Sequence, residues 1–252
     1  KEFMQKYHPM GSLAPRDVVA RSIDHELKIS GEEFVYLDIT HKDPKEVMSH
    51  FPNIYKKCLS IGIDLTKDMI PVVPAAHYCC GGIKVNLNGE SSIRRLYALG
   101  EASSTGLHGG NRLASNSMME AAVYADAAAR HAISVIDSIE LQRDIPAWDY
   151  EGTAVPEEMA LITQDYKEMQ QIMTNYVGIV RSDVRLERAK RRLEIIFKET
   201  EELYLKSTLS QHLCELRNMI AVGYLIIKQA EARHESVGLH YSIDYPAKPV
   251  EI

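Results

Sequence analysis

The feature that most constrains the fold is a strand-like run, a glycine-rich loop and a long helix that follow one another over residues 96–136. The strand is predicted at LYALG (96–100), where apolar residues run into a glycine. The loop GEASSTGLHGGNR then leads into MMEAAVYADAAARHAISVI (118–136), which is rich in helix-favouring alanine, with Asn116 or Ser117 as the expected cap. A helix that starts after such a loop presents free N–H groups to an anionic or electron-rich group. This arrangement therefore predicts a ligand-binding edge.

A second constraint is the helical pattern that fills most of the last hundred residues. Apolar residues recur at a spacing near 3.6 in three segments, which span 157–180, 183–205 and 209–236. The pattern breaks at Arg181-Ser182 and at Lys206-Ser207. Short breaks between long amphipathic helices are typical of antiparallel packing, so the sequence predicts a C-terminal three-helix bundle.

The remaining segments mix shorter signals. Apolar residues at helical spacing predict a helix at 17–28, and EFVYLDI predicts a strand at 33–39, so residues 1–70 are expected to form a small α+β unit. Prolines and glycines alternate with β-favouring residues over 70–90, and RDIPAWDYEGTAVP (143–156) has the composition of a connector.

Charge and hydropathy exclude several classes of function. The chain has 29 Lys and Arg against 35 Asp and Glu, a net charge of −6, and the two signs are mixed along it. The basic run within 183–205 alternates with glutamates, which favours a solvated, ion-paired helix face over an RNA-binding stripe. No apolar stretch is long enough for a bilayer and no signal pattern is present. We therefore expect a cytoplasmic protein with no nucleic-acid or membrane partner.

The four cysteines have no metal-binding spacing. Cys58, Cys79, Cys80 and Cys214 contain no CxxC pair, and adjacent Cys79 and Cys80 would join only through a strained ring. We expect reduced thiols in buried or half-buried positions and no metal site.

Three cationic or ionisable residues stand among small neighbours that leave room for a ligand. They are Arg16 in LAPRD, His77 in PAAHYCCGG and Arg112 in LHGGNRLASNS. Two guanidinium groups and a histidine around one cavity would bind a dicarboxylate. The alternative is that each is structural: Arg16 pairs with Asp17 or a helix end, His77 bonds in a turn, and Arg112 lies on the surface.

Four segments resemble the L-aspartate oxidase family, a branch of the fumarate reductase and succinate dehydrogenase flavoprotein superfamily. They are SLAPRDVVARSID (12–24), PVVPAAHYCCGGIKV (71–85), LYALGEASSTGLHGGNRLASNSMMEAAVY (96–124) and RHESVGLHYSIDYP (233–246). The resemblance extends over nearly the whole chain. The sequence departs from the family at Cys79-Cys80, where relatives usually have Thr-Cys or Thr-Met.

The resemblance implies a role for individual residues. Arg16 matches the catalytic arginine, a proton donor or acceptor beside the substrate, and His77 and Arg112 match positions that bind substrate carboxylates. The cofactor implied is FAD: Glu101 matches the carboxylate that hydrogen-bonds the ribityl chain, while Ser117 and Met118 match the helix start that meets the isoalloxazine ring.

The resemblance also implies the domain organisation. The expected fold is an α/β flavoprotein fragment, in which 1–70 is part of the capping (substrate) domain and 71–140 is the C-terminal part of the FAD-binding domain. The C-terminal helical domain then occupies 141–252. The chain lacks the GxGxxG loop of an FAD-binding domain, has no initiating Met and opens within a motif. We therefore expect the C-terminal half of a longer enzyme.

The reaction that the resemblance implies is FAD-dependent oxidation of L-aspartate to iminoaspartate, the first step of de novo NAD biosynthesis. Fumarate and O₂ are the implied electron acceptors, and quinolinate synthase is the implied functional partner. Two alternatives stay open. One is a fumarate reductase or succinate dehydrogenase flavoprotein subunit, and the other is a non-catalytic helical interaction module.

Overall fold

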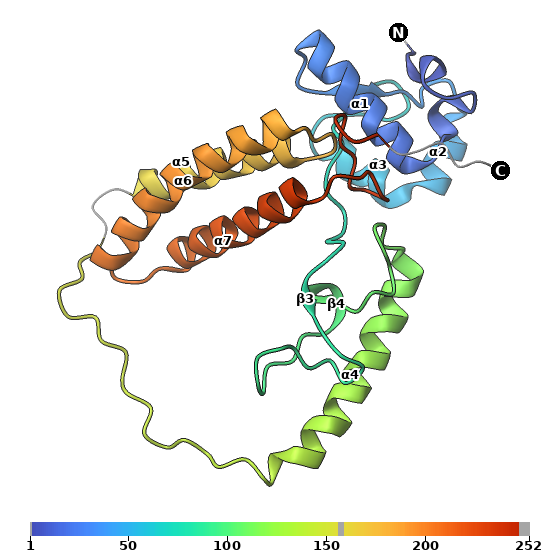
Figure 1. The fold of residues 1–252 in the computed structure, drawn as a ribbon. Helices are drawn as coiled ribbons and strands as arrows, with labels where there is room; N and C mark the ends of the chain where they lie inside the picture. The colour runs from blue at the N-terminus through green and yellow to red at the C-terminus, as the bar shows by residue number, and fades with distance from the viewer. Residues whose placement is uncertain (1, 156–158, 247–252) are drawn as a thin grey trace. The chain divides into compact units, whose positions relative to one another are not determined.

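A computed structural model describes residues 2–155 and 159–246 of the 252-residue chain. The chain divides into two compact units, Lys1–Ala75 and Ala76–Ile252. Each unit contains helices and one two-stranded sheet (Figure 1).

The first unit begins with two short 3₁₀ helices and then a long α-helix. The 3₁₀ helices are η1 (Met4–Lys6) and η2 (Gly11–Leu13), and the long helix is α1 (Arg16–Ser30). Helix α1 ends at Gly31, whose φ of 75° lets its N–H bond back to the Leu27 carbonyl at 2.9 Å. The helix predicted at 17–28 is confirmed.

A small sheet and two short helices complete the first unit. Strand β1 (Val35–Leu37) pairs antiparallel with β2 (Ile70–Val72), and α2 (Pro44–His50) and α3 (Pro52–Leu59) lie between them in sequence. Asp43 caps α2 by accepting from the N–H groups of Lys45 and Glu46. Val47, Cys58 and Leu65 form the core of this part of the unit. The expected mixture of helix and strand over 1–70 is thus observed.

The second unit opens with a two-stranded parallel ladder. Strand β3 (Ile83–Lys84) pairs with β4 (Ser103–Ser104), and the 3₁₀ helix η3 (Gly100–Ala102) leads directly into β4. The strand predicted at 96–100 is wrong. Tyr97 makes only an isolated bridge to Glu90, because no strand of the described chain lies beside this segment to complete a ladder.

Helix α4 (Ala114–Ile136) follows the glycine-rich loop. It begins earlier than predicted, and neither Asn116 nor Ser117 caps it. Leu113 is the N-cap residue and gives no side-chain hydrogen bond. The Ser117 hydroxyl instead donates to the Leu113 carbonyl at 3.0 Å, inside the first turn.

The connector after α4 has no helix or strand over 141–150. Its far end is attached to the turn between the last two long helices: the N–H of Ala154 donates to the Lys206 carbonyl, and the N–H of Thr208 donates to the Ala154 carbonyl. Pro156 of the predicted connector lies outside the described residues.

Three long helices form the rest of the unit. They are α5 (Met159–Ile172), α6 (Asp183–Lys206) and α7 (Gln211–Ala232), and a π-helical turn, η4 (Met173–Val177), extends α5. The serines at both predicted breaks mark real boundaries. Ser182 caps α6 by accepting from the N–H of Arg185, and Ser207 follows its last residue. The predicted start at 157 and 158 lies outside the described residues.

All three helices contribute to one apolar core. Its buried members include Ile162 and Met169 from α5, Leu193 from α6 and Leu213 and Ile220 from α7. Burial of apolar side chains at roughly 25 cal/mol per Å² is what makes long helices stable in water, where isolated ones are marginal. This core is the largest in the described chain.

The segment after α7 folds back as an ordered loop. The Ser236 hydroxyl accepts from the N–H of Ser242 at 2.9 Å and donates to the Tyr245 carbonyl at 2.6 Å. The same loop reaches the glycine-rich loop before α4, where the N–H of Leu239 donates to the Gly110 carbonyl at 2.9 Å.

Gly110 and Gly238 make that approach possible. A Cβ on Gly110 would lie 2.9 Å from the Val237 carbonyl oxygen, and one on Gly238 would overlap the Gly110 carbonyl. Gly238 also has a φ of 59°, which glycine adopts without steric cost. Two backbones therefore meet here where side chains would not fit.

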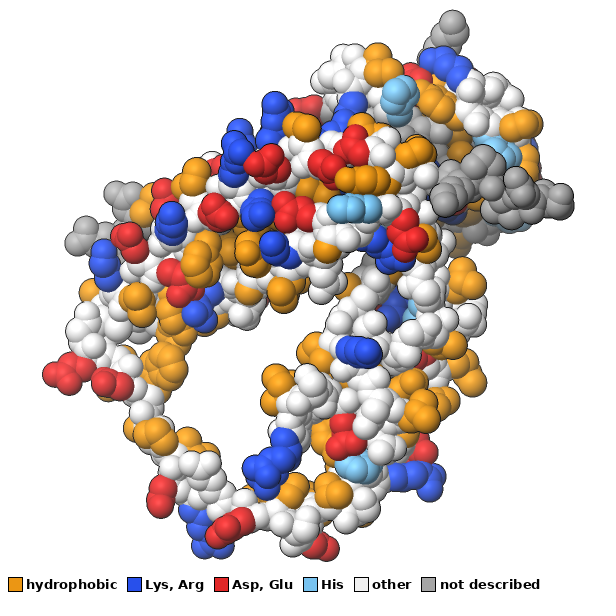
Figure 2. Space-filling view, viewed as in Figure 1, with side chains coloured by type: hydrophobic (Ala, Val, Ile, Leu, Met, Phe, Trp, Pro, Cys, Tyr) orange, Lys and Arg blue, Asp and Glu red, His pale blue; other side chains and the backbone are white. Residues whose placement is uncertain are grey.

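The surface of the helical region carries charges of both signs. Figure 2 shows Lys and Arg side chains interspersed with Asp and Glu over α5 and α6. The predicted basic run is ion-paired, as in Arg191 with Glu187, Lys190 with Glu231 and Arg192 with Glu168. None of the helices in residues 2–155 and 159–246 combines the length and the apolar content needed to span a membrane.

Candidate functional site

The predicted site residues are distributed over both units. Arg16 belongs to the first unit, and His77, Glu101, Arg112, Ser117 and Met118 belong to the second. The convergence of Arg16 with the other residues therefore stays a prediction.

Arg16 stands at the first position of α1 and is exposed. Its Nη2 donates to the carbonyls of Ser12 at 2.6 Å and Ala14 at 2.7 Å, on the 3₁₀ turn before the helix. Asp17 pairs instead with Arg21 at 2.8 Å. The guanidinium is thus anchored at one nitrogen by backbone carbonyls and has no carboxylate partner within the described chain.

His77 is also exposed, in the segment before β3. Its ring contacts that of Tyr78, with centroids 4.4 Å apart and planes tilted by 58°. No hydrogen bond within the described residues uses either ring nitrogen. Both nitrogens are therefore open to a ligand.

Arg112 has the opposite environment, since only 6% of the residue is exposed. Its Nη1 donates to Oε2 of Glu120 on α4 at 2.8 Å, and its Nε donates to the Cys79 carbonyl at 3.0 Å. Its backbone N–H lies 3.4 Å from the Cys80 sulfur. The alternative of a surface arginine is therefore wrong, because the glycine-rich loop folds this side chain against α4.

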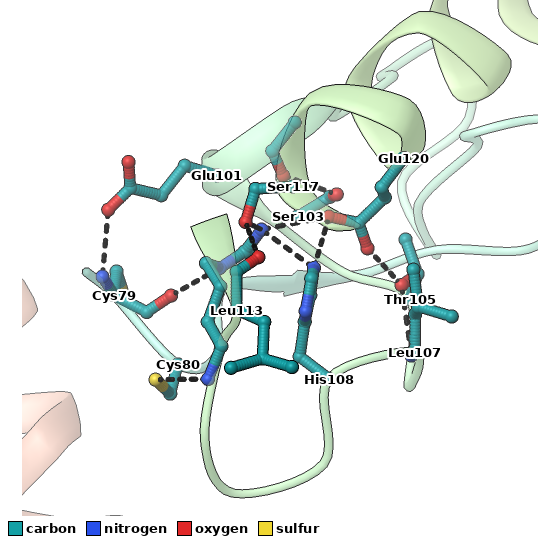
Figure 3. Close-up of polar contacts among 12 residues, drawn as sticks. Cys79, Cys80, Glu101, Ser103, Thr105, Leu107, His108, Leu113, Ser117 and Glu120 are labelled. Atoms are coloured by element: carbon teal, nitrogen blue, oxygen red, sulfur yellow. Dashed lines mark hydrogen bonds and ion pairs between the residues drawn. The ribbon is translucent and has the colours of Figure 1, made fainter. Parts of the chain in front are cut away.

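The carboxylate of Glu120 is the centre of a buried polar cluster (Figure 3). Oε2 accepts from Arg112 and lies 2.9 Å from Nε2 of His108, and Oε1 accepts from the Thr105 hydroxyl. The Glu120 side chain is fully buried, and those of Arg112 and His108 are 3% and 7% exposed. A buried carboxylate with three donors is fully compensated.

The contacts of His108 favour one tautomer. Its Nε2 lies 2.9 Å from the Glu120 oxygen and 3.1 Å from Nη1 of Arg112, which is itself a donor. Because a carboxylate only accepts and a guanidinium only donates, a proton on Nε2 satisfies the carboxylate. His108 therefore acts on Glu120 as a donor.

The cluster sets the charge of Glu120. Burial by itself raises the pKa of its carboxyl, but the hydrogen bonds from Thr105, His108 and Arg112 outweigh burial and lower the pKa below its usual value. Glu120 is therefore ionised at neutral pH and balances the charge of Arg112.

Glu101 is tied to the same backbone segment. Its Oε1 accepts from the N–H of Cys79 at 2.8 Å, and the residue is exposed in η3. No described group engages its second oxygen. A carboxylate in this state can accept from a hydroxyl donor such as those of a ribityl chain, so it fits the predicted role toward FAD.

The N-terminus of α4 also fits a flavin. Its first N–H groups have no intrahelical acceptor, and no side chain caps them. Met118 is 77% exposed, and Ser117 lies just after the uncapped turn. These groups would present donors and a positive dipole end to the electron-rich edge of a flavin ring.

A small cavity adjoins the cluster. Its volume is about 40 Å³, and its lining includes Arg112, His108, Glu120, Cys80 and Thr105. That space suits one or two water molecules or a single carboxylate-sized group.

The sequence prediction missed Thr105, His108 and Glu120. His108 lies four residues before Arg112 and Glu120 lies eight residues after it. A glutamate on the inner face of an alanine-rich helix is a signal that could have found the cluster, because a buried carboxylate requires cationic or donor partners. The free cysteines are as predicted except that Cys79 is exposed.

Two family models match this chain. Residues 1–118 match the FAD binding domain model, and residues 166–249 match the model of the fumarate reductase flavoprotein C-terminus. Among solved structures, a quinol-fumarate reductase with menaquinol molecules superimposes with a TM-score of 0.79 at 26% identity, covering 100% of this chain and 50% of that one. Mycobacterium smegmatis Sdh1 in complex with UQ1 gives 0.75 at 28%, covering 97% and 43%. The chain thus belongs to the fumarate reductase and succinate dehydrogenase flavoproteins.

Within that superfamily, several curated L-aspartate oxidases are similar to this chain. The Yersinia pestis enzyme is 49% identical over 97% of this chain and 46% of its own length, and the Pseudomonas aeruginosa enzyme is 46% identical over 98% and 46%. A chloroplastic L-aspartate oxidase 2-a of Nicotiana tabacum is 44% identical over 98% and 40%. The chain spans about half the length of the curated relatives it matches.

Proposed function

We propose that this chain supplies the dicarboxylate site and the flavin-facing groups of an FAD-dependent L-aspartate oxidase, which converts L-aspartate to iminoaspartate. The observation that carries the proposal is the buried Arg112, which Glu120 and the Cys79 carbonyl hold by two of its three nitrogens. The identity of 44–49% to L-aspartate oxidases supports this branch of the superfamily.

Different residues of this chain would serve in substrate binding and in proton transfer. His77 and Arg112 bind the two carboxylates of the substrate, since an imidazole N–H and a guanidinium are both strong donors to oxygen anions. The family resemblance assigns Arg16 to proton transfer at the carbon that reacts. Because arginine is a poor base in water, it is better suited to donate a proton to fumarate in the reverse sense and to stabilise negative charge during amino-acid oxidation.

FAD, held by Glu101, Ser117 and Met118, would supply a two-electron acceptor for the hydride that leaves Cα of the substrate. Glu101 would accept from the ribityl hydroxyls through the oxygen that Cys79 leaves open. The uncapped first turn of α4 would donate to the electron-rich edge of the flavin ring. The product then belongs to NAD biosynthesis, and quinolinate synthase is the proposed consumer of iminoaspartate in the cytoplasm.

The domain organisation is part of the same proposal. We infer that 1–70 belongs to the capping domain, 71–140 to the FAD-binding domain and 141–252 to a C-terminal helical domain built as a three-helix bundle. The shared core of α5, α6 and α7 supports the last assignment.

The second candidate is a fumarate reductase or succinate dehydrogenase flavoprotein subunit. The superposition on quinol-fumarate reductase at a TM-score of 0.79 favours it as the alternative. Such an enzyme would use the same arginine and histidine positions on succinate and fumarate, without an amine.

A chimaera tests the proposal. Residues 1–252 replace the matching part of the Yersinia pestis L-aspartate oxidase, which is 49% identical over the matched region. We expect a yellow protein that oxidises L-aspartate and produces iminoaspartate. A flavin-loaded chimaera that oxidises succinate and not L-aspartate would support the alternative. The chain alone is expected to be colourless, because it lacks the glycine-rich loop that binds pyrophosphate.

A further inference from the structure

We propose that Glu120 is a positioning residue for Arg112, which it holds by one edge so that the Nη2 edge of the guanidinium faces the substrate carboxylate. The inference rests on the proposed function, in which Arg112 binds that carboxylate. It assigns a task to the buried carboxylate of α4, to which the resemblance and the comparisons give no role.

The first step of the argument is the geometry of the guanidinium, which is a rigid plane with three nitrogens. Nε is fixed by the Cys79 carbonyl at 3.0 Å, and Nη1 by the Glu120 carboxylate at 2.8 Å. Two fixed nitrogens determine the position of the third. No hydrogen bond in the described chain uses Nη2, so this nitrogen keeps both N–H groups for a ligand.

The second step is the rigidity of Glu120 itself. Its side chain is fully buried and its two oxygens are held separately, Oε1 by Thr105 and Oε2 by Arg112 and His108. Thr105 directly follows β4, and His108 and Arg112 lie in the glycine-rich loop before α4. Because both of its oxygens are held, the Glu120 carboxylate fixes the orientation of the Arg112 guanidinium, just as hydrogen-bond partners fix the orientation of metal-binding histidines.

The third step concerns charge. Glu120 is ionised at neutral pH and balances the positive charge of Arg112, so the Glu120–Arg112 pair carries little net charge. The affinity of Arg112 for a substrate carboxylate must then come from the direction of its Nη2 donors rather than from net charge. A change that frees Arg112 should therefore weaken substrate binding even though it unmasks a cation.

The test uses three variants of Glu120 and one control in the chimaera described above. Glu120→Ala removes the anchor. Glu120→Gln keeps an oxygen toward Arg112 and His108, and its amide can donate to Thr105 once that hydroxyl turns. Glu120→Asp withdraws the carboxylate by one methylene. The control is Asp126→Asn, which removes a carboxylate of α4 that pairs with Arg130 at the surface and is 63% exposed.

We expect Glu120→Ala to raise the KM for L-aspartate and the Ki for fumarate about 10- to 100-fold with a smaller change in kcat, since misplacement of a binding group by about 1 Å has effects of this size. Gln should restore both constants to within about threefold of the parent, Asp should fall between, and Asp126→Asn should match the parent.

Wild-type KM and Ki in folded Glu120→Ala would overturn the proposal, and so would equal losses in the Ala and Gln variants. If Glu120→Ala does not fold, Gln and Asp decide: Gln must bind like the parent and Asp must bind more weakly. Absence of L-aspartate oxidation in the parent chimaera would count against the proposed function alone. Fumarate binding to the flavin-loaded variants, measured by calorimetry, would then decide whether Glu120 positions Arg112.

Discussion

Arg181 and His240 meet at 2.7 Å, where Nη1 of the arginine donates to Nδ1 of the histidine across 59 residues of sequence. Arg181 also donates from Nε to the Val177 carbonyl at 2.8 Å. Its backbone N–H donates to the Tyr241 carbonyl, and its own carbonyl accepts from the N–H of Ile243, both just after His240. The pair therefore fastens the loop after α7 to the turn between η4 and α6. Because Nδ1 accepts, the imidazole is neutral and carries its proton on Nε2, which is buried and makes no hydrogen bond to any residue that the structure describes.

This arrangement predicts that the protein loses stability as the pH is lowered. Burial lowers the pKa of His240 first, and the neighbouring Arg181 charge lowers it further. Below pH 6.5 the unfolded chain, in which the histidine has its ordinary pKa, therefore binds more protons than the folded chain. The stability that neutral His240 contributes is present above pH 6.5 and is lost as the pH falls through the lower pKa of the folded chain.

We expect the His240→Asn variant to lose less stability than the parent between pH 7.5 and 5.0, because an amide oxygen still accepts from Arg181 and does not titrate. Chemical unfolding of both proteins at the two pH values measures this difference. Arg233 and Glu235, which also act on His240, are the same in both proteins. An identical loss in the two proteins would contradict the assignment.

The meeting of Gly110 and Gly238 gives a second prediction. An alanine at 238 combines an unfavourable φ of 59° with overlap of the Gly110 backbone, which has no flexible end to move. Gly238→Ala is expected to cost about 1 to 3 kcal/mol more than Gly109→Ala, which has a similar φ of 54° and open space around it. Thermal unfolding compares the two variants. Equal destabilisation would show that the close approach of the two loops adds nothing to the cost of the substitution at Gly238.

The two arginines of the proposed site are expected to differ kinetically. Arg112→Lys in the chimaera cannot serve both Glu120 and the Cys79 carbonyl, so we expect it chiefly to raise the KM for L-aspartate. Arg16→Lys should lower kcat and kcat/KM together, because it removes a contact made in the transition state. Steady-state kinetics of the two variants tests this, and matching profiles would remove the distinction between their roles.

Limited proteolysis tests the domain proposal. Residues 141–150 have neither helix nor strand, while α5, α6 and α7 share a buried core. We expect the first cut in that connector or in the N-terminal part, leaving a helical piece of domain size identifiable by mass. A first cut within 160–230 with 70–136 protected would contradict this boundary.

The sequence predicted the elements whose signals are local. The 3.6-residue apolar spacing and the breaking serines located α6 and α7 to within a few residues, since amphipathic helices carry their burial pattern in their own sequence. Residues 96–100 look like a strand by composition, but a ladder needs a neighbour and the described chain provides none there.

The candidate site was likewise predictable only where its signals are local in the sequence. The positions of Arg16, His77 and Arg112 follow from short motifs, but the burial of Arg112 depends on Glu120, which lies two helical turns into α4. Nothing in the sequence motif around Arg112 shows that Glu120 balances its charge. The start of α4 was misplaced because serine and asparagine usually cap helices, whereas the Ser117 hydroxyl donates inward to the Leu113 carbonyl.

The contacts of Cys79 determine which mutations that position tolerates. Its N–H donates to Glu101 and its carbonyl accepts from Arg112, so both contacts are made by the main chain and neither uses the thiol. Serine, threonine or alanine would leave both contacts in place. Proline alone removes the N–H, so it would release the carboxylate proposed to hold FAD. A mutational scan of this residue should therefore show that most substitutions are tolerated and that proline is not.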